Sequence, residues 1–225
     1  MLFTESAVRD NIRNRDGKRV FYLGKGDQLT SEARDYLQRE RIEILPGEKA
    51  RPARYRLLSG GFAEEKPEHM THLCGDILVP KTHPRIAFRG AMDTLEAELL
   101  WCAHSLPAFR SQLQEILSLA RKLISCDVLE EPVPQQSLCG LTMQQLREHS
   151  HRPQDFYGQP HFMPEVSDGE AVLLLNRVRS IARAAELKAA AAFRDENGLP
   201  TREDILKALN RISSMLYILM IQAKK

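Results

Sequence analysis

Apolar residues recur three and four positions apart along most of the second half of the chain. From Pro107 to about Val128 this spacing is carried by Leu113, Ile116, Leu117, Ala120, Leu123 and Ile124. It predicts a helix with one stripe of side chains facing a core. Comparable spacing predicts further helices from Pro84 through Trp101, from Thr142 to Ser150, from Asp168 to Phe193 and from Arg202 to Ala223.

The N-terminal part of the chain has shorter apolar segments. Lys18 to Leu23 is typical of a strand, Ser31 to Glu40 of a helix, and Ile42 to Leu45 is a further apolar patch. Together they predict a small βαβ-like unit. Proline, glycine and charged residues between Pro46 and Pro67 then predict a linker or a long mobile loop.

We therefore expect a mainly α protein, in which a five-helix bundle is preceded by a small α/β N-terminal unit. The expected boundary lies near residue 68. The N-terminal unit and linker would occupy residues 1–67, and the helical-bundle domain residues 68–225.

The composition is that of an ordinary globular protein, with 43% hydrophobic and 28% charged residues and a formal net charge of +2. So small a charge gives no support for a nucleic-acid or anionic-membrane partner, and we expect neither. The longest apolar run, Leu216 to Ile221, is far shorter than the ~20 residues of a membrane-spanning helix. The charged N-terminus carries no export signal, so we expect a cytoplasmic protein.

Several kinds of site are disfavoured by missing motifs. Neither GxxxxGK[ST] nor a strand-turn-helix GxGxxG occurs, which argues against a P-loop or a dinucleotide fold. His69, His72 and Cys74 lie close together, but three candidates without a fourth predict no metal site. The spacing of the cysteines indicates isolated, buried thiols at Cys74, Cys102, Cys126 and Cys139.

Two predicted helices carry a line of polar residues beside their apolar stripe. Arg179, Arg183 and Glu186 share one face, since they are separated by four and three positions. They form either a solvated face or a clamp for polyphosphate, whose oxygens match the forked donors of arginine. On the last helix the corresponding line is Asn210, Ser214 and Tyr217. Asn210 could equally hydrogen-bond to a neighbouring helix.

Three of these segments resemble one enzyme family. Lys81 to Leu95 (KTHPRIAFRGAMDTL) is similar to the segment that opens the bundle in ATP:cob(I)alamin adenosyltransferases. Arg179-x-x-x-Arg183-x-x-Glu186 resembles the arginine-rich ATP helix of that family, and Leu209 to Ser213 (LNRIS) resembles its terminal motif. The motifs occur in the family's order at nearly its spacing. Asp127–Gly140 and His149–Gly169 are similar to segments of the ethanolamine-utilisation branch.

The resemblance implies transfer of the 5′-deoxyadenosyl group of ATP to cobalt(I) of a reduced corrinoid, making adenosylcobalamin. ATP, Mg²⁺ and cobalamin would be the cofactors and substrates. It also implies a homo-oligomer, a dimer or a trimer, with ATP sites between subunits. The location would be the cytoplasm or a bacterial microcompartment, whose proteins would then be partners.

The resemblance also implies roles for individual residues. Catalytic roles fall to Arg183, Asp93 and Arg179, with Asp93 pairing with Arg179 across a subunit boundary. The implied ATP-binding residues are Lys81, Arg183, Glu186, Asn210 and Arg211. Phe162 would displace the lower ligand of the corrinoid. The alternatives are that Phe162 is an ordinary core residue and that Asp93 faces solvent.

The chain departs from the family at three places. Members of the ethanolamine-utilisation branch carry a Cys-Cys-x-x-Cys cluster, which this chain lacks, so a protein-bound metal is not expected. Of the family's Thr-Gly-Asp-x-Gly-x-Thr loop only Gly75-Asp76 remains, and Ser214 stands where the family has aspartate. Two other functions therefore remain open: a non-catalytic helical docking module of a metabolic compartment, and a regulator that binds ATP or corrinoid without chemistry.

Overall fold

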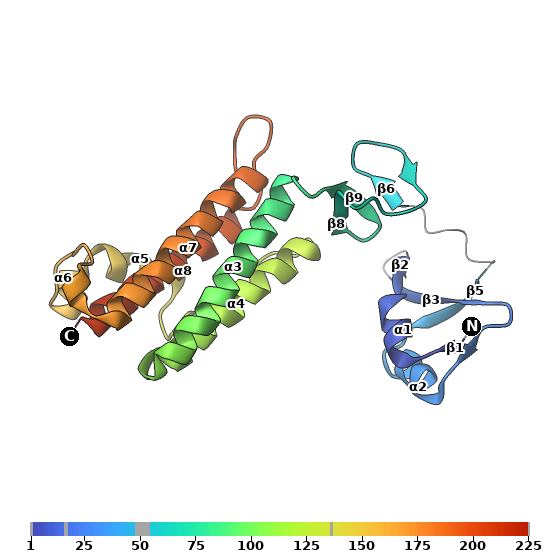
Figure 1. The fold of residues 1–225 in the computed structure, drawn as a ribbon, viewed down its shortest axis with the longest axis horizontal. Helices are drawn as coiled ribbons and strands as arrows, with labels where there is room; N and C mark the ends of the chain where they lie inside the picture. Colours follow the sequence, from blue (N-terminus) through green and yellow to red (C-terminus); the bar gives the residue numbers. More distant parts are fainter. Residues whose placement is uncertain (1, 16–17, 48–54, 136, 225) are drawn as a thin grey trace. The chain divides into compact units, whose positions relative to one another are not determined.

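The computed structural model describes residues 2–15, 18–47, 55–135 and 137–224 and forms two compact units, Met1–Val79 and Pro80–Lys225 (Figure 1). Each unit has its own cluster of buried apolar side chains. The boundary expected near residue 68 falls within the first unit. The assignment of residues 1–67 and 68–225 to two domains with different roles stays a prediction.

The first unit begins with short strands and two helices. Its elements up to residue 47 are β1 (Leu2–Phe3), α1 (Glu5–Asp10), β2 (Arg13–Arg15), β3 (Lys18–Gly24), β4 (Gln28–Leu29), α2 (Ser31–Arg39) and β5 (Glu43–Gly47). Because β3 and β5 are parallel neighbours and α2 connects them, the predicted βαβ-like unit is confirmed. Phe21 of β3 and Leu37 of α2 are both buried in one small apolar core.

A four-stranded sheet forms the rest of the first unit, with strand order β7-β6-β9-β8. The strands are β6 (Tyr55–Leu57), β7 (Phe62–Ala63), β8 (Met70–Cys74) and β9 (Ile77–Pro80). The prediction of a linker or mobile loop from Pro46 to Pro67 is therefore wrong where the chain is described, because β6 pairs with both β7 and β9. Residues 48–54 of that segment lie outside the described residues.

The second unit is the predicted helical bundle. Its helices are α3 (Pro84–Ser105), η1 (Pro107–Phe109), α4 (Arg110–Val128), α5 (Met143–His151), α6 (Pro153–Tyr157), η2 (Val166–Asp168), α7 (Glu170–Ala192) and α8 (Glu203–Ala223). All five predicted helices are present, and the short α6 is an addition. Local sequence explains their starts: Pro84 occupies the first turn of α3, and Thr142 and Gln145 form a capping box on α5.

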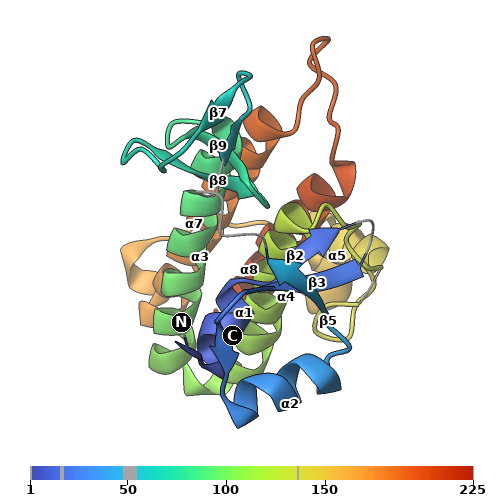
Figure 2. The same cartoon turned by 90° about the vertical axis from the view of Figure 1, so that its right-hand side faces the viewer.

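The long helices α3, α4, α7 and α8 lie side by side, and α8 packs on α7, α5, α4 and α6 (Figure 1). Every residue of α8 from Met215 to Ile221 is buried. The connection between α7 and α8 projects beyond the ends of both helices (Figure 2). None of the helices in the described ranges has the length and apolar character that crossing a membrane requires.

A buried carboxylate ties the start of α3 to the end of α4. Asp127 is completely buried, and its two carboxylate oxygens accept hydrogen bonds from Arg85 Nε at 2.8 Å and Arg89 Nε at 2.6 Å. Arg85 also donates to the Asp127 carbonyl oxygen. With two cationic partners the buried charge is compensated, so this network fixes how α3 and α4 meet.

A second ion pair anchors the start of α8. The Asp204 carboxylate accepts hydrogen bonds from Arg202 Nε at 2.9 Å and from the Val133 backbone N–H at 2.8 Å. The hydrogen bond from Arg202 and, less strongly, that from Val133 lower the pKa of Asp204 from 3.8 to about 2. They connect the first turn of α8 to the segment that follows α4.

This pair predicts acid-sensitive stability. A carboxyl whose folded pKa is depressed stabilises the fold above its unfolded pKa, and the contribution is lost as pH falls from about 4 towards 2. We expect Asp204→Asn to lose about 1 to 2 kcal/mol of unfolding free energy at pH 7. The difference from wild type should shrink below about pH 3 in urea titrations. Glu203→Gln, in the same helical turn, is the control and should show no such convergence.

Candidate functional site

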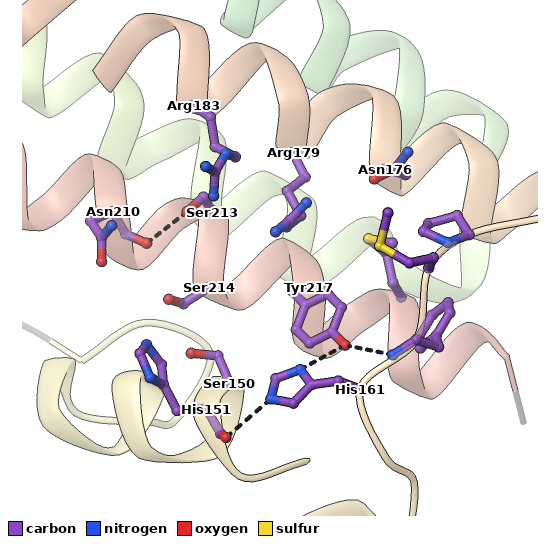
Figure 3. Close-up of a pocket in the computed structure, with 14 residues that line it drawn as sticks. Ser150, His151, His161, Asn176, Arg179, Arg183, Asn210, Ser213, Ser214 and Tyr217 are labelled. Atoms are coloured by element: carbon purple, nitrogen blue, oxygen red, sulfur yellow. Dashed lines mark hydrogen bonds between the residues drawn. The ribbon is translucent and has the colours of Figure 1, made fainter. Parts of the chain in front are cut away.

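The bundle contains a cleft of about 650 Å³ between α7, α8, the end of α5 and the segment 161–164 (Figure 3). Its lining residues are Ser150, His151, His161, Phe162, Met163, Pro164, Asn176, Arg179, Arg183, Asn210, Ser213, Ser214, Tyr217 and Met220. One wall carries positive charge and amide or hydroxyl groups, and the segment 161–164 contributes apolar side chains. The cleft can therefore receive a ligand that is anionic on one side and apolar on the other.

The charged wall is the pair of arginines on α7. Arg179 and Arg183 both extend from α7 towards α8 in Figure 3, and both line the cleft. Burial lowers the pKa of Arg179, and the charge of the neighbouring Arg183 lowers it further. Among the described residues neither arginine has an ion pair with a carboxylate. An anion entering the cleft would relieve this repulsion and gain forked hydrogen bonds.

Asn210 joins the two walls of the cleft. Its Nδ2 donates to Glu186 Oε1 on α7 at 3.1 Å, and its Oδ1 accepts from Arg211 Nη1 at 2.5 Å. The helix-to-helix hydrogen bond considered from sequence is therefore present. Since an amide nitrogen carries two hydrogens, one donor remains for a ligand in the cleft.

Arg211 itself is not part of the cleft lining. It is buried, and its Nε donates to the Met143 carbonyl at the start of α5 at 2.7 Å. Burial, and secondly the charge of Arg147, lower the pKa of Arg211. Its observed contacts fix α5 on α8 and orient the Asn210 amide.

Tyr217 connects α8 to the segment that carries Phe162. Its hydroxyl lies 3.1 Å from His161 Nδ1 and 3.2 Å from the Phe162 backbone nitrogen, both drawn in Figure 3. The rings of His161 and Phe162 stack on the Tyr217 ring at centroid distances of 5.7 and 5.9 Å. The Arg179 guanidinium carbon lies 5.3 Å from the centroid of the same ring.

Phe162 is half-buried and lies between two side chains. Tyr217 stacks against its ring, and Lys224 Nζ lies 4.2 Å from the ring centroid. Lys224 also forms an ion pair with Asp168 at 2.7 Å. Phe162 packs on the core cluster, as the core alternative expected, and it also lines the cleft. Its role towards a corrinoid stays a prediction. The neighbouring Met163 is 84% exposed, which leaves an apolar rim beside the cleft.

The structure brings together some of the predicted site residues and leaves others apart. Arg179, Arg183, Asn210 and Phe162 line the cleft, and Glu186 contacts it through Asn210. Lys81, which precedes α3, and Asp93, in its third turn, are exposed and do not line it. The polar line predicted on the last helix is confirmed, because Asn210, Ser214 and Tyr217 all line the cleft.

Sequence reasoning missed four polar lining residues, Asn176, Ser150, His151 and His161. Asn176 could have been found, because it stands three positions before Arg179 and seven before Arg183 on the same helical face. No periodicity marks the two histidines. His161 lies outside the helices, and His151 ends α5.

The cysteines and histidines of the first unit form no recognisable metal centre in the described ranges. No group of three or more His, Cys, Asp or Glu side chains there could hold a metal ion. His72 Nδ1 lies 3.1 Å from the Gly75 carbonyl oxygen, to which it can donate. All four cysteines are free, but only Cys102 and Cys126 are buried, so the expectation of burial is wrong for Cys74 and Cys139, which are half-exposed.

Comparison with known proteins adds an independent observation. A family model described as "Cobalamin adenosyltransferase" matches residues 62–223. "Corrinoid adenosyltransferase EutT" of Salmonella typhimurium strain LT2 is 30% identical, with 97% of this chain and 90% of that protein aligned. The EutT protein of Escherichia coli K12 is 35% identical over the same shares of the two chains.

Proposed function

We propose that the cleft is the ATP-binding and transfer site of this protein, on the premise that the chain belongs to the cobalamin adenosyltransferase family. The enzyme transfers the 5′-deoxyadenosyl group of ATP to cobalt(I) of a reduced corrinoid. The single observation that carries the placement is the arginine pair on α7, which faces the cleft without a carboxylate partner among the described residues.

The reaction is a nucleophilic substitution at the 5′ carbon of the ribose. An electron pair on cobalt(I) forms the cobalt–carbon bond, and the carbon–oxygen bond to the triphosphate breaks, so cobalt becomes formally cobalt(III). No proton has to be removed from the nucleophile. The tasks of the protein are therefore to align the two substrates, to stabilise negative charge on the departing phosphate oxygen and to exclude water.

Arg183 supplies the charge stabilisation, and Arg179 offers further donors beside it while the partner subunit's Asp93 compensates its charge. Guanidinium groups remain protonated at any working pH and offer paired donors to phosphate oxygens. Glu186 and Asn210, already in contact at 3.1 Å, orient ATP and the Mg²⁺ that accompanies it. Arg211 acts on ATP indirectly, because it donates a hydrogen bond that holds the Asn210 amide in place. Lys81 is exposed and would reach the phosphates of an ATP bound between subunits.

The apolar side of the cleft receives the corrinoid. Phe162 lines it from the segment 161–164, and the exposed Met163 extends the apolar surface outward. An apolar side chain at this position would take the place of the corrinoid's lower ligand and has no atom that could coordinate cobalt, which would favour a four-coordinate and more easily reduced cobalt. Phe162 is therefore assigned to the lower face of the corrinoid.

The role of the arginines predicts a loss of activity without a loss of fold. We expect Arg183→Ala to abolish transfer while helix content, measured by circular dichroism, is unchanged, because Arg183 is exposed and its removal leaves no cavity. The assay mixes protein, ATP, Mg²⁺ and chemically reduced cobalamin and follows the light-sensitive alkylcobalamin spectrum.

The matched control is Arg121→Ala, which removes an exposed arginine on α4 that pairs with Glu96 away from the cleft. It should retain near wild-type turnover. Near-normal turnover by folded Arg183→Ala would contradict the placement. ATP or corrinoid binding by wild type without any transfer would favour a binding module instead of an enzyme.

The lack of the Cys-Cys-x-x-Cys cluster generates a second prediction. We expect activity to survive prolonged treatment with a strong transition-metal chelator once Mg²⁺ is resupplied, since thiolate clusters are the sites that bind such metals tightly. Turnover is measured before treatment, after it, and after adding iron or zinc. Activity that returns only with iron or zinc would reveal a metal site involving groups such as His69, His72 and Cys74.

The ATP site is proposed to lie at a boundary between two copies of the chain. On α3, Asp93 and Leu100 lie seven positions apart on one exposed face, and Leu100 is 49% exposed. Trp101 on α3 and Leu187 on α7 are also exposed, by 58% and 73%. Such large apolar side chains on neighbouring helices suit a homo-oligomer interface. A carboxylate from Asp93 of the partner subunit would compensate Arg179.

This arrangement predicts a reciprocal effect of charge. We expect Asp93→Ala and Arg179→Ala each to weaken the oligomer and lower turnover, at a cost of about 3 to 5 kcal/mol for a partly buried pair. Exchanging the charges, with Asp93→Arg and Arg179→Asp together, should recover part of the association. Sedimentation and turnover are the measurements, with Glu96→Ala as a control that breaks the exposed pair with Arg121.

A structure of the oligomer gives the decisive geometry. Asp93 and Arg179 more than ~8 Å apart in every subunit pairing would contradict the pair, because an ion pair requires about 4 Å.

We further infer a place in ethanolamine utilisation, in the cytoplasm or within a bacterial microcompartment. The likeness to EutT proteins over nearly the whole chain supports this context. The first unit has its own core, and none of its described residues is among those that line the cleft. We propose that it is the part of the chain that contacts proteins of such a compartment.

A further inference from the structure

Tyr217 lines the cleft and contacts both the segment 161–162 on its apolar side and Arg179 on its charged side. Its hydroxyl contacts the segment that carries Phe162, whereas its ring lies under Arg179. It comes from the buried part of α8, which packs against several other helices. A buried helix is a firm support from which to position two otherwise separate groups.

The donor and acceptor roles of the hydrogen bonds follow from their partners. His161 Nε2 lies 3.1 Å from the His151 carbonyl oxygen, which can only accept, so Nε2 carries the hydrogen. In the neutral ring Nδ1 is then an acceptor, and the Tyr217 hydroxyl donates to it. The Phe162 backbone N–H in turn donates to Tyr217 Oη. The hydroxyl thus acts as donor and acceptor towards two successive residues.

These bonds limit the movement of a segment without regular structure. His161 and Phe162 belong to neither a helix nor a strand, and backbone of this kind is ordered only by the contacts it makes. Tyr217 supplies two hydrogen bonds and two ring contacts to it. Lys224 adds a contact to the Phe162 ring and an ion pair to Asp168. The position of Phe162 in the cleft therefore depends on Tyr217.

We propose that Tyr217 is a positioning residue for adenosyl transfer, whose hydroxyl fixes Phe162 at the corrinoid and whose ring seats Arg179 at the phosphates. The inference rests on the proposed function and goes beyond it, because it separates the contributions of one side chain to the two substrates. The hydroxyl acts only on the corrinoid side of the cleft, where it positions Phe162. The aromatic ring contacts both Phe162 and Arg179, on the corrinoid side and the phosphate side.

The test is a pair of substitutions at one position. Tyr217→Phe removes both hydrogen bonds and keeps the ring, so we expect the KM for the reduced corrinoid to rise about tenfold, as for two hydrogen bonds of ordinary strength. The KM for ATP should stay within about twofold. Tyr217→Leu removes the ring as well, and the KM for ATP should then rise too, because Arg179 loses its cation–π contact.

The chain offers a matched control in a second histidine–tyrosine pair. His149 Nδ1 lies 2.9 Å from the Tyr157 hydroxyl, and neither side chain lines the cleft. Tyr157→Phe removes an equivalent hydrogen bond from the same bundle and should change neither KM. An equal rise in the corrinoid KM in Tyr157→Phe would show that general loosening, rather than Tyr217, is responsible.

A third variant keeps the inference testable should the Tyr217 variants fold poorly. His161 is exposed, so His161→Ala should fold, and it removes one of the two hydrogen bonds of the tyrosine hydroxyl. We expect its corrinoid KM to rise about threefold, less than in Tyr217→Phe. An unchanged corrinoid KM in His161→Ala or Tyr217→Phe, or an equal rise for both substrates in Tyr217→Phe, would overturn the role of Tyr217.

A spectroscopic readout distinguishes positioning from a merely structural role. With ATP and cobalt(II) corrinoid bound, electron paramagnetic resonance measures the share of cobalt that has lost its lower ligand. This share should fall in Tyr217→Phe and not in Tyr157→Phe. Wild-type protein that neither turns over nor binds corrinoid would overturn the proposed function as well, whereas normal wild-type turnover with unaltered variants would overturn the Tyr217 assignment alone.

Discussion

The burial of α8 is the constraint on which the rest of the bundle depends. Its residues from Met215 to Ile221 are enclosed by other helices, so its polar groups must find partners or face the cleft. Arg211 bonds to the start of α5, Asn210 to Glu186, and Tyr217 to the segment 161–162. The hydrogen bonds that satisfy these polar groups also attach α5, α7 and the Phe162 segment to α8.

The opposite wall of the cleft follows a different rule. On α7 the half-buried Arg179 faces the cleft beside Arg183, and burial and mutual repulsion act together to lower the Arg179 pKa. In a protein selected only for stability, we would expect a carboxylate beside such a pair. Asp127 is the carboxylate that pairs with Arg85 and Arg89. The contrast between these two arginine pairs in one bundle supports the proposal that the charge of Arg179 and Arg183 serves a ligand or a partner subunit.

In the cleft, different residues supply the lining and its support. Arg183 and Arg179 reach into the cleft, whereas Arg211 and Tyr217 act largely by holding Asn210 and Phe162 in place. This division explains why a motif residue such as Arg211 can lie buried with backbone and amide partners. The terminal motif therefore places a cleft-lining side chain, Asn210, next to a buried residue that supports it, Arg211.

The sequence by itself determined the five bundle helices, the βαβ-like unit and the arginine line, because each depends on spacing within one segment. Three motifs in order also sufficed to indicate the family. The strands β6, β7, β8 and β9 were missed because such short strands depend on pairing with one another. Only the tertiary structure decided that Arg211 is buried, that Lys81 and Asp93 lie outside the cleft and that His161 meets Tyr217, 56 residues apart in the chain. Such contacts join segments that are far apart in the chain, and the local sequence of one segment does not predict its contact with the other. Only the packing of the whole fold creates them.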